Sequence, residues 1–559
     1  MKGVPINIKP PTRFRVFRRM KLRFREVHQG FETSVSIGLG VAWGVRSGLQ
    51  GFRHSGACRR EHVALGVHAR GDRTEKEDGG MAARPAGGWV EGPRAGGYPA
   101  AACDRSSVGL GGEGVGWVWR GVDTGDAHGR LWFGPLGCAW MLAVPLLALE
   151  IGLSVALWYL LAVPFHAAFP RARQRVYWPV RDWVARRMLR DPEHDADMLP
   201  TYLVVPAVVG GVFLWHLATH LGLFAREGGA SPPEGLAFLA RALTYHVVRL
   251  GLFFTHPAYF WTLVHAEAHA DADIFRGPPR RKVRVLEWGP MAILYGVVPE
   301  ASFGVGHVKV HHARPTNSVA DLHGTREYRR DSPRAFLDML CKFALAWTGV
   351  SVLWHAVAVR RMGHAMVARV AAGMGAYYGT VWALARVAGT RFAAAYLLWP
   401  QVEAIMLLGA IAWFQHAFVD PDAPDDELVN SITIVDSTYD VFSADYHAVH
   451  HLAPRLPWWK AKAHFEADRA TYAAKRATVF RGCQEFECFF LLLQGNLDAL
   501  VDRMDPPEHV AKGTEHVRLA WQARQREVLD RRLRPFPVLG ISWTRGIVPG
   551  DAHESTHDA

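Results

Sequence analysis

The chain has 559 residues, of which 50% are hydrophobic and 21% are charged, and it carries a formal net charge of +12. Its apolar residues concentrate between about positions 137 and 418, which excludes an ordinary pair of soluble domains. The arginines flank apolar segments instead of forming one basic surface, so no nucleic-acid partner is expected. The six cysteines include no CxxC pair, which argues against a disulfide framework or a thiolate zinc site.

Residues 1–135 differ in composition from the rest of the chain. They are rich in glycine and arginine, strongly basic from Arg13 to Arg25, and poor in apolar periodicity. We predict a disordered or transit-like N-terminal extension here. An extension of the gene model explains the segment equally well, because Met81 could begin a shorter chain.

Five later segments are long and apolar enough to cross a hydrocarbon core of about 30 Å, which needs roughly 20 residues. They are residues 137–165, 199–223, 236–263, 364–387 and 392–413. The seven arginines of residues 171–190 place that segment on the cytoplasmic face, or on the stromal face of a plastid membrane. Residues 136–198 are therefore predicted to hold an extra transmembrane helix and a basic loop, ahead of a core of four spans.

The predicted topology brings the histidine-rich segments to one face. The two spans after the basic loop cross and return, so His265 and His269 become cytoplasmic. The cluster that begins at His447 shares this face only if one of the three apolar segments before it does not cross. Residues 336–357 are predicted to lie in the interface, and residues 285–305 to lie there or re-enter. The predicted fold is an all-α integral membrane protein with a four-span helical core, one extra N-terminal span, interfacial helices and a cytoplasmic histidine-ligated metal site.

Two histidine clusters follow in chain order. His265 and His269 are four residues apart and therefore share one helical face, as chelation of a metal requires. In the second cluster, His307 and His311 share a face. His312 lies about 140° round from His307 on an α-helix, so the helix must end or distort there.

The third cluster, His447-Ala-Val-His450-His451, has the strongest local signal, because its spacing brings three rings toward one side of a helix. His416 follows the last predicted span at the same face and is the natural additional ligand. These nine imidazoles suffice for two metal ions, whereas one zinc ion uses three or four ligands. Imidazole binds iron, copper and zinc, so ligand type alone does not identify the metal. The simpler alternative is a set of interfacial histidines that bind lipid headgroups.

Three further polar residues lie inside predicted spans. His216 and His220 repeat the HxxxH spacing, but the predicted topology places them toward the opposite face, so we expect them to bond neighbouring helices. Glu403 lies in the last span, where an ionisable group is a functional candidate. We expect it to pair with a residue such as Arg391, to shape a substrate tunnel, or to be a protonated carboxyl group bonded to a neighbouring helix.

The order HxxxH, HxxxHH and HxxHH resembles the membrane fatty acid desaturase superfamily, which also includes hydroxylases and related oxygenases. The resemblance extends over residues 199–459 and includes His311-His312-Ala-Arg-Pro-Thr-Asn317 and Tyr328-Arg-Arg-Asp331 after the second cluster. It implies a desaturase domain with two non-haem iron ions, which use O2 as co-substrate and remove hydrogen from an unactivated methylene. The metal ligands that it implies are His265, His269, His307, His311, His312, His416, His447, His450 and His451.

One position departs from the family pattern. Some members have an asparagine four residues before the histidine that follows the last span, bonded to a metal-bound water. Ala412 stands at this position here. Gln415 and Asn430 are hypothetical replacements.

The resemblance also implies partners. The expected substrate is a fatty acyl chain on a membrane lipid or an acyl thioester such as acyl-CoA, in a multi-pass protein of the endoplasmic reticulum or a plastid membrane. No haem-binding domain is evident, so we expect an external electron donor, either a cytochrome b-type protein or a ferredoxin with its reductase. Basic loops near Arg280 or Arg329 are candidate docking sites. Residues 460–559 are predicted to be a cytoplasmic helical region, with helices at 465–480 and 516–532 and a disordered end, which caps the metal site.

Three alternatives to desaturation remain open. A lipid or alkyl-chain hydroxylase would use the same scaffold. A zinc-dependent membrane hydrolase would need about three histidines and a bound water. A non-catalytic metal sensor or transporter would have ligands along a path across the bilayer instead of at one face.

Overall fold

The computed structural model describes residues 135–157, 160, 173–224, 234–251, 257–270, 274–276, 284–313, 317, 321–358, 362–437 and 439–536. All of these residues belong to one compact unit of the chain. The predicted N-terminal extension, the basic turn at Arg280 and the predicted disordered end lie outside the described residues.

The N-terminal half of the described chain is helical. Its elements are α3 (Pro135–Leu157), η2 (Arg173–Tyr177), α6 (Trp178–Met188), η3 (Asp195–Met198), α7 (Leu199–Val205), η4 (Pro206–Gly210), α8 (Gly211–His220), α9 (Gly235–Gly251) and α10 (Pro257–His269). The segment from η3 to α8 forms one helix, Asp195–His220, that is long and apolar enough to cross a membrane. This helix contains most of the span predicted at residues 199–223.

The next part of the chain contains a second helix of this kind. Its elements are α11 (Val285–Trp288), α12 (Pro290–Leu294), η6 (Gly306–His311), α13 (Pro333–Trp347), α14 (Val350–Ala358), α15 (Gly363–Ala388), α16 (Thr390–Ala393), η8 (Ala394–Leu398) and α17 (Trp399–Gln415). The run from α16 to α17, Thr390–Gln415, is the second candidate span. It begins after a turn at Gly389, whose φ of 86° favours glycine.

The other predicted spans also fall on helices. Residues 137–165 overlap α3, residues 236–263 overlap α9 and α10, and residues 364–387 lie within α15. Helices α13 and α14 meet at a bend of 67°, as in a broken span or a re-entrant loop, so residues 336–357 are not one straight helix. The described residues thus hold two candidate spans, or three if this bent pair counts as one. The total of five crossings stays a prediction.

The C-terminal part adds two short strands to a chain that is otherwise mostly helical, as predicted. Its elements are α18 (Glu427–Asn430), β1 (Thr433–Val435), α19 (His447–Leu452), η9 (Trp458–Lys460), α20 (Ala461–Ala474), β2 (Val479–Arg481), α21 (Glu485–Leu493), α22 (Leu497–Asp502), α23 (Glu508–Ala511) and α24 (Glu515–Leu533). Strands β1 and β2 pair in parallel, with Ile434 opposite Phe480. The helix predicted at residues 465–480 is wrong at its end, because Phe480 lies in β2. The helix predicted at residues 516–532 is confirmed as α24.

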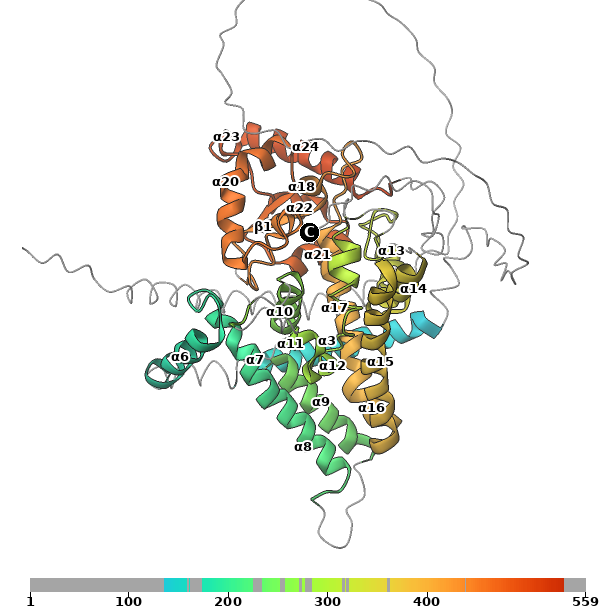
Figure 1. Ribbon diagram of the computed structural model, residues 1–559. Helices are drawn as coiled ribbons and strands as arrows, with labels where there is room; N and C mark the ends of the chain where they lie inside the picture. Colours follow the sequence, from blue (N-terminus) through green and yellow to red (C-terminus); the bar gives the residue numbers. More distant parts are fainter. Residues whose placement is uncertain are drawn as a thin grey trace, which may run out of the picture. The chain divides into compact units, whose positions relative to one another are not determined.

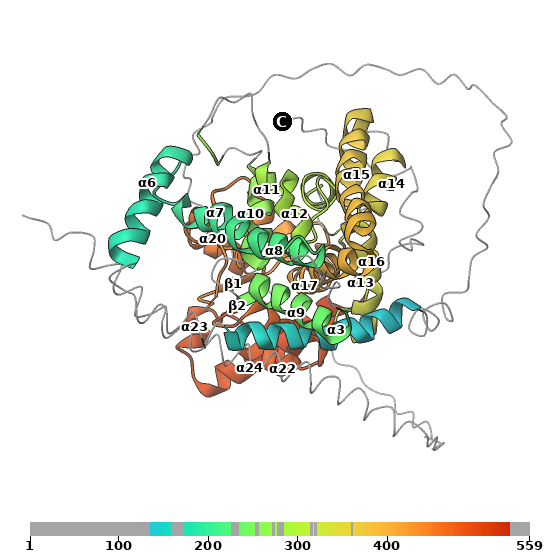
Figure 2. The ribbon, with the colours of Figure 1, turned by 90° about the horizontal axis from the view of Figure 1, so that it is seen from below.

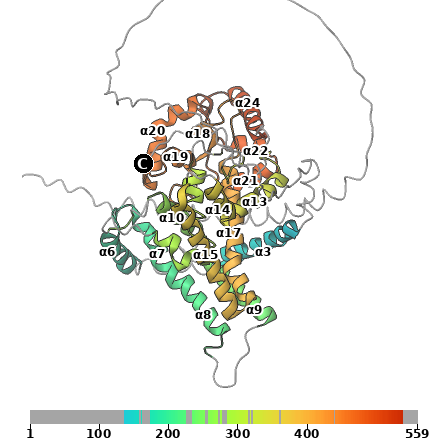
Figure 3. The ribbon, with the colours of Figure 1, turned by 45° about the vertical axis from the view of Figure 1, so that its right-hand side comes forward.

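Helix α10 lies between two groups of helices. Figures 1 and 3 show α7, α8, α9 and α15 on one side of α10, and α20, α22 and α24 on the other. Helix α3 packs across α9 (Figure 2). The chain segments that carry the histidines therefore meet at the junction of the apolar helices and the C-terminal part.

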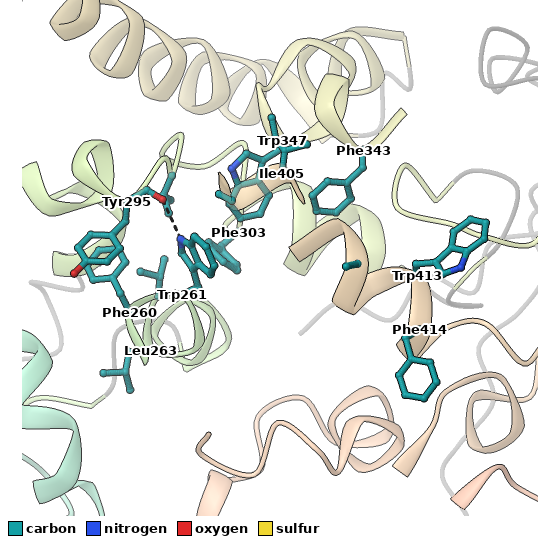
Figure 4. Packing of buried hydrophobic residues seen from close by; sticks show 14 of the residues in the cluster. Phe260, Trp261, Leu263, Tyr295, Phe303, Phe343, Trp347, Ile405, Trp413 and Phe414 are labelled. Carbon is teal, nitrogen blue, oxygen red and sulfur yellow. Dashed lines mark hydrogen bonds between the residues drawn. The ribbon is translucent and has the colours of Figure 1, made fainter. Parts of the chain in front are cut away.

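A continuous aromatic core holds this junction in place (Figure 4). Phe260 of α10 stacks on Tyr295, with ring centroids 4.3 Å apart. Trp261, next to it, donates a hydrogen bond to the carbonyl oxygen of Tyr295 at 2.9 Å. Trp347 of α13 donates to the carbonyl oxygen of Gly296 at 2.7 Å. Because these indole N–H groups are paired, the large rings are buried without an unsatisfied donor.

Candidate metal centre

The first histidine pair lies at the end of α10. His265 and His269 occupy its last two turns, and their ring centroids are 4.8 Å apart. Between them, Glu267 is fully buried and accepts hydrogen bonds from the backbone N–H groups of Val285 and Leu286, each at 2.8 Å. The carboxylate thus caps α11 and fixes the end of α10 against the segment that leads to the second cluster. Sequence reasoning missed this role of Glu267, although a carboxylate between two metal ligands is a visible signal.

The second cluster lies on a π-helical turn, η6, instead of an α-helix. The backbone N–H of His312 donates to the carbonyl oxygen of His307 at 3.0 Å, which is an i to i+5 bond. The predicted distortion at His312 is thereby confirmed. The wider turn brings the Nε2 atoms of His312 and His307 to 3.0 Å, while His311 points to a different neighbour.

The third cluster is a short helix, α19, and it does not act as one unit. His450 Nε2 lies 2.9 Å from Nε2 of His312. His447 and His451 instead approach each other, with Nε2 atoms 2.9 Å apart. The three rings lie together on one side of the helix, as predicted, with centroids 4.5 to 5.9 Å apart. They are divided between two groups of histidines, because His450 faces one group and His447 and His451 face the other.

All nine predicted ligands converge in two groups. Group one consists of His265, His269, His307, His312 and His450. Group two consists of His311, His416, His447 and His451. Within each group, the ligand nitrogens all lie within 4.8 Å of one another. The two groups adjoin, because the rings of His312 and His451 stack with centroids 4.4 Å apart.

The residues fit a metal ion at each group. Two imidazole nitrogens bound to one ion at right angles, each about 2.1 Å from it, lie about 3.0 Å apart. The Nε2 atoms of His265 and His307 are 2.7 Å apart, and those of His416 and His447 are 3.0 Å apart. His269 Nε2 is buried and has no hydrogen-bond partner among the described residues. A metal ion bound between these nitrogens would bring them together and would give His269 Nε2 a partner.

Burial keeps these imidazoles neutral. Desolvation lowers the pKa of His265 and of His416 to about 3. The same cause lowers the pKa of His307 and of His447 well below its usual value, and neighbouring histidines lower it further. A metal ligand must be deprotonated, so the protein presents these nitrogens in the state that binding requires.

A buried carboxylate orients one ligand of group two. Asp321 Oδ2 lies 2.9 Å from Nδ1 of His311 and also accepts the backbone N–H of Asn317 at 3.1 Å. Its Oδ1 accepts the backbone N–H of His323 at 2.8 Å. Although burial acts to raise the pKa of Asp321, its contacts with His311 hold that pKa well below its usual range. The contact leaves Nε2 of His311 as the nitrogen for a metal ion.

The same loop holds His416 in place. The backbone carbonyl oxygen of His416 accepts hydrogen bonds from Thr325 Oγ1 at 2.6 Å and from Asn317 Nδ2 at 3.4 Å. Asn317 has a φ of 59°, a conformation that asparagine tolerates better than most residues. Asn317, Asp321 and Thr325 therefore support a ligand from each of two distant segments, η6 and the end of α17.

The proposed replacements for Ala412 are engaged elsewhere. Gln415 donates to Glu485 Oε1 at 2.6 Å. The side chain of Asn430 donates to the carbonyl oxygens of Ala423 and Pro424 and accepts the backbone N–H of Asp420. Only the carbonyl oxygen of Asn430 approaches a ligand, at 3.4 Å from Nδ1 of His416.

The polar residues inside the predicted spans have structural partners. His216 Nδ1 lies 2.8 Å from the hydroxyl of Tyr396, and His220 Nε2 lies 2.8 Å from the carbonyl oxygen of Ala388. The prediction that both bond neighbouring helices is confirmed. Glu403 pairs with the buried Arg249, so Arg391 was the wrong partner.

Arg329, a candidate for docking an electron donor, is half exposed. Its guanidinium pairs with Asp331 at 2.7 Å and lies 3.7 Å from Asp530. The two carboxylates offset part of the positive charge that an acidic partner would meet.

The described residues thus combine candidate membrane spans with two groups of histidines that could each hold a metal ion. The family model described as fatty acid desaturase matches residues 239–482, which include all nine histidines. This segment is a domain of the membrane fatty acid desaturase superfamily, as the order of the clusters predicted. No curated protein and no solved structure matches the chain.

Proposed function

We propose that this protein is a membrane-bound, oxygen-dependent fatty acyl desaturase with two non-haem iron ions, one at each histidine group. The observation that carries the proposal is the convergence of nine histidines, from four separate segments, on two adjoining points inside a desaturase-family domain. Nine ligands exceed what one zinc ion takes, which favours iron chemistry over the zinc-dependent hydrolase. The two histidine groups lie beside each other instead of along a path across the bilayer, which disfavours a metal transporter.

The nine histidines would hold iron, which when bound would supply the chemistry of O2 activation needed to remove hydrogen from an unactivated methylene. The chain contributes the conditions for that chemistry. Neutral imidazoles leave the positive charge of the metal uncompensated, which makes the centre strongly oxidising. Group two is fully buried, so bulk water is kept from it. Asp321 fixes the ring orientation of His311, and Thr325 and Asn317 fix the backbone of His416.

The two outcomes on this scaffold differ in what the acyl chain receives. In desaturation, two hydrogen atoms leave the chain, and O2 takes them with two electrons and two protons to give two molecules of water. In hydroxylation, one oxygen atom stays on the chain. Both reactions need an external electron donor, for which a cytochrome b-type protein or a ferredoxin with its reductase is proposed. The proposed substrate is an acyl lipid or acyl-CoA in the endoplasmic reticulum or a plastid membrane.

The direct test is the lipid composition of cells that express the full chain. Expression in air should add a double bond to an acyl chain, detected by mass spectrometry as a loss of two hydrogens. His451→Ala should abolish the product, because it removes a group-two ligand. His220→Ala is the matched control, since it removes a histidine of the same HxxxH spacing whose Nε2 bonds the carbonyl oxygen of Ala388 and which belongs to neither group.

Three results would decide between the alternatives. A product heavier by one oxygen atom identifies a hydroxylase. Release of free fatty acid without O2 identifies a hydrolase. An unchanged lipid profile in cells that also supply both classes of electron donor contradicts the proposal.

A further inference from the structure

Helix α6, with the η2 turn before it, presents an outer face of unusual composition. Val180, Trp183 and Arg187 follow one another at i, i+3 and i+7, which places them on one side of the helix. Val180 is 55% exposed and Trp183 is 52% exposed. Val176, in η2, is exposed as well. Exposed apolar and aromatic side chains that share one helix face are typical of a surface that contacts a membrane or another partner.

Arginines flank this apolar face. The guanidinium of Arg187 lies over the ring of Trp183, 3.8 Å from its centroid. Arg175 and Arg186 are exposed, and no acidic side chain of the described residues pairs with either. Arg181 differs, because it points inward and pairs with Asp182 and Asp197. The outer face is therefore apolar at its centre and positively charged at its edges.

Helix α6 lies where a candidate span begins, so its outer face lies at the level of the lipid headgroups. The ion pair from Arg181 to Asp197 ties the helix to the beginning of the candidate span Asp195–His220. Where a span begins, hydrocarbon gives way to lipid headgroups. In Figures 1 and 2, α6 extends beyond the end of α7, and no other described helix covers its outer side.

Backbone contacts fix the other end of α6 near the histidines. Leu189 forms a β-bridge with Phe275. The backbone N–H of Arg276 donates to the carbonyl oxygen of Met188 at 2.7 Å. The backbone N–H of Arg190 donates to the carbonyl oxygen of Ile274 at 3.0 Å. Residues 274–276 follow α10 closely, whose last residue is His269. Helix α6 is thus attached at the same level as the candidate metal centre.

We propose that α6 is a membrane-surface helix that binds anionic lipid headgroups. Its valines and Trp183 enter the headgroup boundary, where tryptophan is favoured. Arg175, Arg186 and Arg187 contact the negative charges of the leaflet that carries the metal centre. The partner of this outer face is a lipid surface and not a protein. The face lies where the candidate span Asp195–His220 begins, and it combines apolar side chains with arginines. Lipid binding by α6 does not depend on which reaction the metal centre performs.

The test uses the full chain in lipid nanodiscs and measures hydrogen–deuterium exchange of residues 175–188. One set of discs contains phosphatidylcholine only, and the other contains about one third phosphatidylglycerol. The exchange of this peptide should slow in the anionic discs. In the double variant Arg186→Gln/Arg187→Gln, the ratio of exchange rates between the two kinds of disc should be smaller than in the wild type by about tenfold or more. The reason is that each basic residue near an anionic leaflet strengthens binding by about a factor of five.

Two further variants complete the experiment. Arg518→Gln/Arg524→Gln makes the same charge change on exposed positions of α24 and should keep the effect of anionic lipid on α6. Val180→Asn/Trp183→Asn should speed exchange in both kinds of disc. The proposal is overturned if wild-type α6 exchanges equally in the two lipids, or if the α6 double-arginine variant responds to phosphatidylglycerol as the wild type does.

Discussion

At the scale of single residues, the candidate metal centre depends on groups that are not ligands. Asp321 is the clearest case, since its two oxygens join His311, Asn317 and His323. It lies ten residues after His311 in a loop, and nothing in its spacing distinguishes it from other aspartates. Ligands that share a helix can be predicted from periodicity. Their supporting partners come from loops, whose geometry depends on the whole fold.

Asp321→Asn should weaken metal binding without abolishing it. The amide keeps the volume but removes the charge that orients His311, and loss of such a partner lowers metal affinity about tenfold to a hundredfold. The measurement is retention of metal during titration with a chelator. Asp422→Asn, at an exposed carboxylate paired with Arg531, is the control and should retain metal as the wild type does. Equal retention in the two variants would show that Asp321 has no such role.

The buried carboxyl group of Glu485 predicts that the stability of the fold depends on pH. Burial raises its pKa to about 7 from an ordinary value of 4.5. A raised pKa in the folded state gives stability that is complete below the ordinary pKa and is lost as the pH rises through about 7. Glu485→Gln cannot ionise and can still accept the hydrogen bond from Gln415.

The variant should therefore be more stable than the wild type at pH 8, by about 3 kcal/mol, and the difference should vanish near pH 4. Thermal unfolding in detergent at several pH values measures this. Glu508→Gln, at an exposed ion pair with Lys512, should show little difference from the wild type at any of these pH values. A Glu485→Gln protein that is less stable than the wild type at pH 8 would contradict the raised pKa of Glu485.

At the scale of elements, periodicity predicted the long helices and failed at short ones. Apolar runs located α8, α15 and α17, because burial of a continuous apolar face requires that pattern. The π-helical turn η6 was anticipated only as a distortion at His312, from the mismatch between histidine spacing and an α-helix. Strands β1 and β2 have three residues each. Segments this short carry no periodic signal, and their pairing joins residues far apart in sequence.

The packing of α15 gives a sharp test at this scale. A methyl group added to Gly373 would overlap the carbonyl oxygen of Pro299, in the segment that leads to η6. Gly375 lies on the same helix with nothing within 4 Å of an added Cβ. Gly373→Ala should therefore lower the melting temperature and the metal content. Gly375→Ala should be neutral or stabilising by up to about 1 kcal/mol, as expected from helix propensity. The same effect from both substitutions would contradict this packing.

At the scale of the whole molecule, one buried guanidinium joins distant segments. Arg330 donates to the carbonyl oxygen of Ala417, next to the ligand His416, at 2.7 Å. It also donates to the backbone carbonyl oxygens of Tyr328 at 2.8 Å and of Arg534, which follows α24, at 2.7 Å. The C-terminal region is thereby attached directly to the segment that carries a predicted ligand. Sequence similarity pointed to this arginine as part of a family motif, but its role follows only from the structure.

Arg330→Lys should destabilise the protein by about 3 to 5 kcal/mol, because lysine cannot supply donors to all of these buried carbonyl groups. Arg329→Lys changes the neighbouring residue, which is half exposed, and should have an effect of about 1 kcal/mol or less. Thermal unfolding of the two variants makes the comparison. Similar melting temperatures would show that Arg330 does not join these segments.

In the proposed centre, each of the two groups of histidines holds an iron ion. Its most direct test is the iron and zinc content per chain of protein purified in detergent, for the wild type, His450→Ala, His447→Ala and the control His220→Ala. We predict about two irons per chain in the wild type and in His220→Ala, with less in the other two variants. A single zinc and no iron in the wild type would contradict a centre of two iron ions.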